Sequence, residues 1–194
     1  GAGWNIQASS VKVQLENGDI QFAFETDPEA EGDAGTYELT GDMKFAAFTI
    51  SANDTLDLNG KRAEFSGTLT NNGTIHYDGL IDAYNIDDNG TANDTATSDL
   101  MLSGIGSADA VLDLPSGTFR TVMINAEGNG KYDQCTVLNA TKLIVAEGQI
   151  ESDGGDWSVT HCTIATGAEL DAGSSDLTVA GDFTTSGGLL GASC

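Results

Sequence analysis

Residues 62–79 read RAEFSGTLTNNGTIHYDG, and this stretch decides the fold. Its apolar residues come one at a time, and Ser, Thr, Asn, Gly and Asp fill the gaps between them. Alternate side chains of a β-strand point to opposite faces, so this spacing indicates short strands with one buried face. Asn and Gly accept the backbone conformations of tight turns. The stretch therefore predicts strands joined by corners, with Asn72-Gly73 at one corner.

The same texture continues through the rest of the chain. From about residue 47, short apolar pieces such as FTI, LDL, TVMI and KLIVAEGQI recur, each ended by Gly, Asn or Asp. No segment keeps a 3.6-residue apolar period over ten residues, so we predict an all-β protein.

A faint repeat favours one β architecture. Leu-Asp recurs at Leu56, Leu112 and Leu170, with offsets of 56 (112 − 56) and 58 (170 − 112) residues. Such offsets fit three coils of roughly 19 residues each, in the size range of solenoid repeats. The pattern predicts a parallel β-solenoid, of the right-handed β-helix type, whose inward residues stack in columns from coil to coil. A β-sandwich or jelly roll is the alternative.

The first 46 residues differ from the body. Residues 11–24 read VKVQLENGDIQFAF, and Asn17-Gly18 is a strong signal for a two-residue hairpin turn. The predicted pairs are Leu15 with Ile20, Val13 with Phe22, and Val11 with Phe24. A second hairpin is expected to pair Leu39 with Met43 and Tyr37 with Phe45.

Two segments follow from these patterns. Residues 1–46 form an N-terminal hairpin element suited to docking, because an exposed strand edge can add to a neighbouring sheet. Residues 47–194 form the solenoid, which residues 87–99 (DDNGTANDTATSD) are expected to interrupt as an exposed polar loop, since they offer few side chains to bury. The chain starts at Gly1 without Met, which indicates a processed chain, an engineered start or a piece of a longer protein.

The net charge of the chain disfavours two classes of partner, nucleic acids and anionic membranes. Thirty Asp and Glu face seven Lys and Arg among 194 residues, for a net charge of −23. Such a surface repels nucleic acid and anionic membranes. The sequence also contains no run of 18 apolar residues, the length that a membrane-spanning helix needs. The acids are scattered along the chain, which favours a folded domain with a solvated acidic surface.

Three sets of residues are candidate sites. The Asn-x-Ser/Thr motif of glycan acceptors occurs five times, and Asn-Gly-Thr is also a good β-corner, so both interpretations stay open. Asp87-Asp88-Asn89-Gly90 begins like a calcium loop, but Ser98 stands where an EF-hand needs Glu; a looser Ca²⁺ site remains the expectation there. The cysteines match no zinc motif, which leaves either a disulfide or buried thiols. The residues are Asn53, Asn72, Asn89, Asn93 and Asn139 as glycan acceptors, Asp87, Asn89 and Asp94 as metal ligands, and Cys135 with Cys162 as a disulfide.

The residue types that catalysis uses are scarce. The chain has two His and two Arg, no Gly-x-Ser-x-Gly elbow and no Gly-rich phosphate loop. His161 and Cys162 are neighbours, but adjacent strand residues point to opposite faces and cannot form a dyad. We therefore predict no catalytic residues, no bound cofactor and no enzyme, with a polysaccharide lyase or hydrolase as the alternative.

Residues 48–75, FTISANDTLDLNGKRAEFSGTLTNNGTI, resemble the β-solenoid segments of virion and cell-surface proteins, such as phage fibres, capsid-decorating proteins and adhesin-like repeats. The resemblance lies in texture over about residues 47–190, and no site residue comes with it. It implies a non-enzymatic structural protein of a virion or extracellular assembly. Such a protein works in many copies, through self-association or contact with other structural proteins. The alternative is a subunit of a cell-surface filament or adhesin assembled by strand addition.

Overall fold

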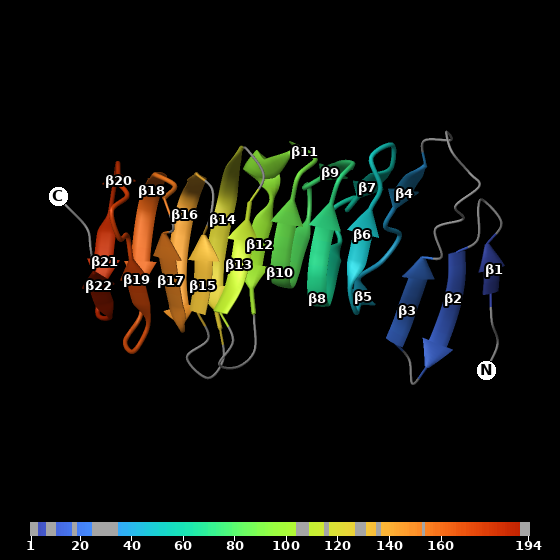
Figure 1. Cartoon of the computed structure of the whole chain (residues 1–194), viewed down its shortest axis with the longest axis horizontal. Coiled ribbons are helices and arrows are strands. Elements are labelled where there is room, and N and C mark those ends of the chain that lie inside the picture. Colours follow the sequence, from blue (N-terminus) through green and yellow to red (C-terminus); the bar gives the residue numbers. More distant parts are fainter. Residues whose placement is uncertain are drawn as a thin grey trace.

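The computed structural model is almost entirely β-strand. It describes residues 4–6, 11–16, 19–24, 35–103, 109–114, 117–126, 131–134, 137–152 and 154–190. From residue 35 onward the strands pair in parallel and form a β-solenoid of about seven turns, which confirms the predicted fold class (Figure 1). Within the described residues, no helix is long and apolar enough to cross a membrane.

Each coil of the solenoid has three sides, here named A, B and C. Side A holds β4 (Thr36–Glu38), β7 (Thr55–Asp57), β9 (Thr74–His76), β11 (Thr91–Asn93), the starts of β14 (Thr118–Asn125), β16 (Leu138–Glu147) and β18 (Trp157–Ile164), and β20 (Leu177–Val179). Side B holds β5 (Met43–Phe45), the starts of β8 (Arg62–Asn71) and β10 (Leu80–Asp88), β12 (Asp99–Leu102), the ends of β14, β16 and β18, and β21 (Phe183–Thr185). Side C holds β6 (Phe48–Ile50), the ends of β8 and β10, β13 (Asp109–Asp113), β15 (Lys131–Gln134), β17 (Gln149–Ser152), β19 (Glu169–Asp171) and β22 (Gly188–Leu190).

The opening stretch shows how local sequence makes a coil. Strand β8 buries Ala63, Phe65 and Leu69 and turns its polar neighbours outward or to intermediate exposure. The strand changes from side B to side C at Gly67, where a Cβ would lie 2.7 Å from the carbonyl oxygen of Ala46 one coil earlier. A side chain does not fit at that corner, so glycine is required by the close approach of the backbone.

The core is a set of columns along the solenoid axis. Phe45 and Phe65, one coil apart, stack with ring centroids 4.8 Å apart, and Phe48 packs against both rings. Tyr77 meets Phe119 edge to face at 5.5 Å. Paired residues of adjacent coils lie between 17 residues apart, as for Asn71 and Asp88, and 26 residues apart, as for Ile86 and Leu112 (112 − 86), and other pairs such as Tyr37 with Leu56 lie 19 apart (56 − 37). The predicted coil length was therefore close to the observed one.

The N-terminal residues form a separate antiparallel sheet of β1 (Trp4–Ile6), β2 (Val11–Glu16) and β3 (Asp19–Phe24). The register of β2 and β3 confirms the three predicted pairs, although the Asn17-Gly18 turn itself lies outside the described residues. Strand β3 lies beside β5, at the N-terminal end of the stack (Figure 1).

The second predicted hairpin is wrong. Thr36–Glu38 and Met43–Phe45 lie on different sides of the first coil, and each pairs in parallel with the next coil: Tyr37 lies opposite Leu56, and Phe45 lies opposite Phe65. The short apolar pieces of a hairpin and of a solenoid corner look alike in sequence. The two differ only in whether a later segment supplies a better partner.

Residues 87–99 also differ from the expectation of a loop outside the coil. They contain the end of β10, all of β11, the 3₁₀ turn Thr95–Thr97 and the start of β12. Most of their side chains are exposed, as expected, but Asp88 and Ser98 are buried because each finds a hydrogen-bond partner in the preceding coil.

The Leu-Asp repeat predicted the fold correctly but for a wrong reason. Leu56 lies on side A opposite Tyr37 and Ile75, whereas Leu112 and Leu170 lie on side C. Even on side C they are out of register, since Leu170 lies opposite Ile150 and Leu112 lies opposite Ile86 and Gln134. The three dipeptides therefore do not form one column.

Candidate functional site

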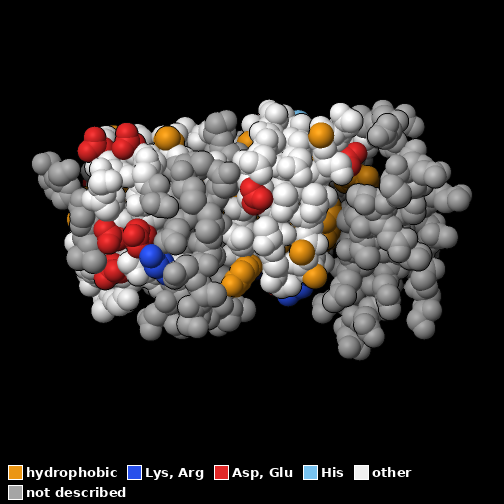
Figure 2. Space-filling view, in the orientation of Figure 1, with side chains coloured by type: hydrophobic (Ala, Val, Ile, Leu, Met, Phe, Trp, Pro, Cys, Tyr) orange, Lys and Arg blue, Asp and Glu red, His pale blue; other side chains and the backbone are white. Residues whose placement is uncertain are grey.

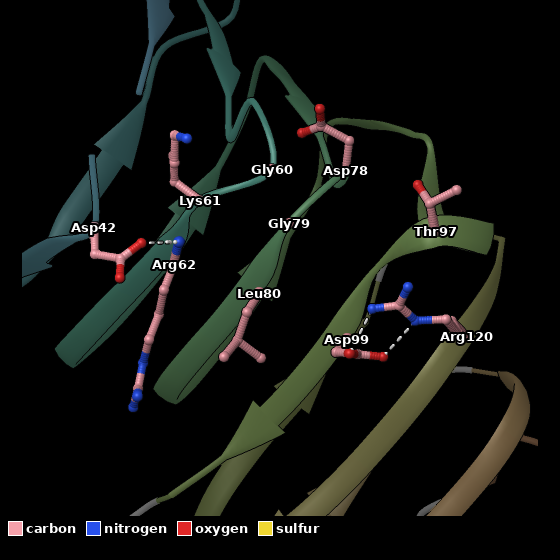
Figure 3. Close-up of a pocket in the computed structure, with 10 residues that line it drawn as sticks. All are labelled: Asp42, Gly60, Lys61, Arg62, Asp78, Gly79, Leu80, Thr97, Asp99 and Arg120. Carbon is pink, nitrogen blue, oxygen red and sulfur yellow. Dashed lines mark hydrogen bonds and ion pairs between the residues drawn. The ribbon is translucent and has the colours of Figure 1, made fainter. Parts of the chain in front are cut away.

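A polar groove runs across successive coils at the corner between sides A and B (Figure 3). Its volume is about 570 Å³, and its lining includes three acidic and three basic side chains. These are Asp42, Asp78, Asp99, Lys61, Arg62 and Arg120, with Gly60, Gly79, Leu80 and Thr97 between them. Three of the seven basic residues of the chain therefore gather at one corner of a strongly acidic protein.

Two of these six charges, on Asp99 and Arg120, neutralise each other. Arg120 donates two hydrogen bonds to the carboxylate of Asp99 in the preceding coil, from Nε at 2.9 Å and from Nη2 at 2.6 Å. Hydrogen bonding to Arg120 lowers the pKa of Asp99, and the same contact raises the pKa of Arg120. Asp99 is thus held as an anion, which makes it unsuited to act as a proton donor near neutral pH.

Arg62 reaches away from the groove to a buried carboxylate on the outside of side B. Its Nη2 pairs with Asp82, whose side chain is only 5% exposed, and the hydroxyl of Ser103 donates to the other oxygen of Asp82. Glu64 lies 3.6 Å from Arg62 and also accepts a hydrogen bond from Lys44 at 3.0 Å. This network links coils through paired charges and leaves no carboxylate poised opposite another.

Lys61 differs from the two arginines, because no ion pair is found for its ammonium group among the described residues. The groove therefore offers one free cation, together with a buried oxygen of Asp78 that has no hydrogen-bond partner there. It could hold a small polar ligand. It shows no nucleophile with an adjacent base, which acyl or glycosyl transfer would need.

The Asn-Gly-Thr motifs at Asn72 and Asn89 form corners that stack directly on one another. Asn71 and Asp88 are paired across the coils, and each accepts a hydrogen bond at 3.0 Å from the glycine two residues later, Gly73 or Gly90. Asp88 also accepts hydrogen bonds from Asn71 at 2.9 Å and from the hydroxyl of buried Tyr77 at 3.0 Å. This confirms Asn72-Gly73 as a turn.

The five glycan-acceptor candidates all have reachable side chains. Asn139 is half-buried and the other four are exposed, namely Asn53, Asn72, Asn89 and Asn93. Three of them, Asn53, Asn72 and Asn89, occupy the corner between sides C and A in successive coils. Glycosylation at these positions stays a prediction.

The candidate metal ligands are only partly brought together. Asn89 donates a hydrogen bond to Asp87 at 2.7 Å, whereas Asp94 pairs with Nδ1 of His76 at 2.9 Å. In the described part of the chain, no group of three or more His, Cys, Asp or Glu could hold a metal ion. A Ca²⁺ site at Asp87, Asn89 and Asp94 stays a prediction.

Cys162, the one cysteine among the described residues, is a structural thiol. Cys162 is free and 1% exposed, it lies in a core column between Leu143 and Phe183, and burial raises its pKa to about 11. The Cys135–Cys162 disulfide is therefore not formed; Cys135 lies outside the described residues. Its neighbour His161 points outward, which confirms that the two side chains face opposite ways.

The coil of β20, β21 and β22 is the last one that the structure describes, and its inward residues are more exposed than those of the coil before it. Phe183 continues the column of Cys162, which is 1% exposed, yet Phe183 is 40% exposed. Leu177, Val179 and Leu189 are likewise only half-buried, although their partners in the preceding coil are buried. Among the described strands, none pairs with the outer edges of β20, β21 and β22.

Sequence reasoning missed the groove. Lys61-Arg62 is the one place where two basic residues are adjacent in the sequence, and that signal could have marked the groove. No family model, curated protein or solved structure matches the chain.

Proposed function

We propose that this chain is a non-enzymatic structural subunit of a virion or extracellular assembly, which works in several copies. The observation that carries the proposal is the parallel β-solenoid of about seven turns, in which each coil contacts only its neighbours. Such a body offers extended surfaces for contact with other subunits.

The sides of the solenoid support the same role. Asp and Glu side chains appear at several places on the visible face (Figure 2). A net charge of −23 keeps solenoids from associating non-specifically through their sides. An edge of the N-terminal sheet of β1, β2 and β3 would carry the backbone groups that strand addition uses, which is how a filament or adhesin subunit would join its neighbours.

The groove at the corner of sides A and B favours a second candidate, a polysaccharide-active enzyme. Lys61, which has no ion pair among the described residues, and the oxygen of Asp78 that has no hydrogen-bond partner among them could contact a sugar acid and a sugar hydroxyl. Catalysis would also need a base and an acid near one another. The pairing of Asp99 with Arg120 and of Asp82 with Arg62 weighs against this candidate.

Two measurements test the proposal together. Purified protein is assayed for turnover on a panel of neutral and acidic glycans, with and without Ca²⁺, and its particles are imaged by negative-stain electron microscopy. We expect no turnover above the buffer blank and discrete multimers or fibres. Turnover that the Lys61→Ala substitution abolishes would overturn the structural role and favour the enzyme.

A further inference from the structure

The groove at the corner of sides A and B holds two opposite charges that the fold does not use. Lys61 and Asp78 lie on neighbouring coils, where Leu80 N–H donates to the carbonyl of Lys61 at 3.0 Å. Their side chains extend to the same side of the ribbon (Figure 3). Among the described residues, neither charged group has an ion pair, and the two are not paired with each other.

The Asp78 carboxylate lacks a hydrogen-bond donor. Its Oδ1 atom is buried, and in the described part of the chain it has no hydrogen-bond partner. A buried carboxylate oxygen without a donor costs folding free energy, so such an atom in a folded protein calls for an explanation. A bound molecule that donates a hydrogen bond to Asp78 would remove this cost.

The space beside the two charges is open. Gly60 lies between Lys61 and Asp78 in the view of Figure 3, and a Cβ at Gly60 would meet nothing within 4 Å. The groove as a whole has a volume of about 570 Å³, which lies in the usual range of small-molecule sites, about 300–1,000 Å³. A small molecule in the groove can therefore contact both charged groups at once.

The rest of the lining narrows the class of ligand. Asp42 accepts a hydrogen bond from the backbone N–H of Arg62 at 2.9 Å and likewise has no ion pair within the described residues. A purely anionic ligand would face two carboxylates in a chain of net charge −23, and a purely cationic one would face the Lys61 ammonium group. Among the described lining residues, Leu80 carries the one large apolar side chain, so a sugar ring finds no aromatic surface.

We propose that this groove binds a small zwitterion of the α-amino-acid type, whose ammonium group donates to Asp78 and whose carboxylate accepts from Lys61. Both contacts are charge-assisted hydrogen bonds, which are the stronger kind in proteins. Asp99 and Arg120 already bind each other and serve as a wall of the groove. The binding site goes beyond the proposed structural role and does not depend on it.

Nuclear magnetic resonance titration of the isotope-labelled full chain tests the site. The probes are neutral α-amino acids, from glycine to phenylalanine, and the analogues acetate, methylamine, glucose and glucuronate. We expect at least one amino acid to bind with a dissociation constant in the millimolar range or below and to shift the amide signals of Lys61 and Asp78. Each analogue makes at most one of the two charged contacts, so each should bind at least about 10-fold more weakly.

Glycine betaine separates charge from hydrogen bonding. It keeps both charges, but its nitrogen carries no hydrogen to donate to Asp78. We expect it to bind at least about 10-fold more weakly than the amino acids. Equal binding would contradict the role given to Asp78.

Two variants and two matched controls complete the test. Asp78→Asn and Lys61→Gln each remove one charge at nearly constant size, and each should weaken binding at least about 10-fold. Asp182→Asn and Lys142→Gln change exposed residues that do not line the groove and should bind as wild type does. In thermal melts, Asp78→Asn should melt at or above the temperature of wild type, because its buried oxygen has no partner to lose.

Several results would overturn the zwitterion site. They are a titration in which no amino acid shifts these amides, acetate, methylamine or a sugar binding as tightly as the amino acids, and a clear loss of stability in Asp78→Asn. The last result would show that Asp78 has a structural partner. Glycan turnover is a different result, which overturns the proposed structural role and not this site.

Discussion

Replacing Gly73 by alanine tests whether the stacked corners fix the height of a coil. Gly73 lies under the preceding corner, where a Cβ would fall well inside 3.0 Å of the carbonyl oxygens of Ser51 and Asp54 and 2.9 Å from Cγ2 of Ile50. The nearest obstacles are backbone atoms, so no side-chain rotation makes room. The two coils must move apart at this corner.

The cost follows from what that movement breaks. Asn72 N–H donates to the carbonyl of Ile50 at 2.9 Å, and Thr74 N–H donates to the carbonyl of Asp54 at 2.9 Å, on either side of the glycine. Overpacking costs about 1–3 kcal/mol, and each weakened hydrogen bond adds about 1 kcal/mol. We expect a loss of about 3 kcal/mol, which lowers the melting temperature of a domain of this size by ~6–12 °C.

The matched control is Gly41→Ala, because a Cβ at Gly41 would meet nothing within 4 Å. Thermal melts followed by circular dichroism should place Gly41→Ala within about 2 °C of wild type, as for most surface substitutions. If Gly73→Ala melts together with Gly41→Ala, the corners do not stack as described. The same would follow if both variants were equally destabilised.

Three further substitutions test the core, the charge network and the buried phenol. Phe65→Ala should lower the free energy of unfolding by about 3–5 kcal/mol, as for a fully buried phenylalanine. Phe183→Ala should lower it by well under half of that in the monomer, because Phe183 is partly exposed. Chemical denaturation should rank the two variants in this order. Arg62→Ala leaves Asp82 buried without its cation, and we expect the free energy of unfolding to fall by about 2–3 kcal/mol. The loss is smaller than for a fully buried ion pair because Arg62 is partly exposed. Arg62→Lys can keep the charge, so the same assay should show part of the stability recovered. Burial, followed by the nearby Asp88 carboxylate, raises the pKa of Tyr77 well above 10, so the folded state holds this proton more tightly than the unfolded state. The resulting stabilisation is fully present below pH 10 and is lost as pH rises above it; Tyr77→Phe should flatten this decline, and an unchanged slope would contradict the assignment.

The sequence was sufficient for the class of fold because the relevant signals are local. Single apolar residues such as Phe65 and Leu69, flanked by Thr, Ser and Asn, mark strands with one buried face. Asn17-Gly18 set the register of the hairpin, since two residues between apolar runs leave one way to pair them. Asn72-Gly73-Thr74 marked a corner for the same reason.

Local sequence signals could not predict which strands pair when the strands lie far apart in the sequence. Tyr37 and Phe45 could equally have faced each other across a hairpin, and only the presence of Leu56 and Phe65 one coil later decides otherwise. Asp88 looks unburiable alone and becomes buried because Asn71 and Tyr77 arrive from other parts of the chain.

The sequence by itself therefore determined that this protein is a ribbon of short strands and corners with a strongly acidic exterior. The tertiary structure alone decided which residues stack and where three basic residues gather in one groove. The physical reason is that strand and turn preferences act within a few residues. A column or a groove exists only when segments about twenty residues apart lie on top of one another.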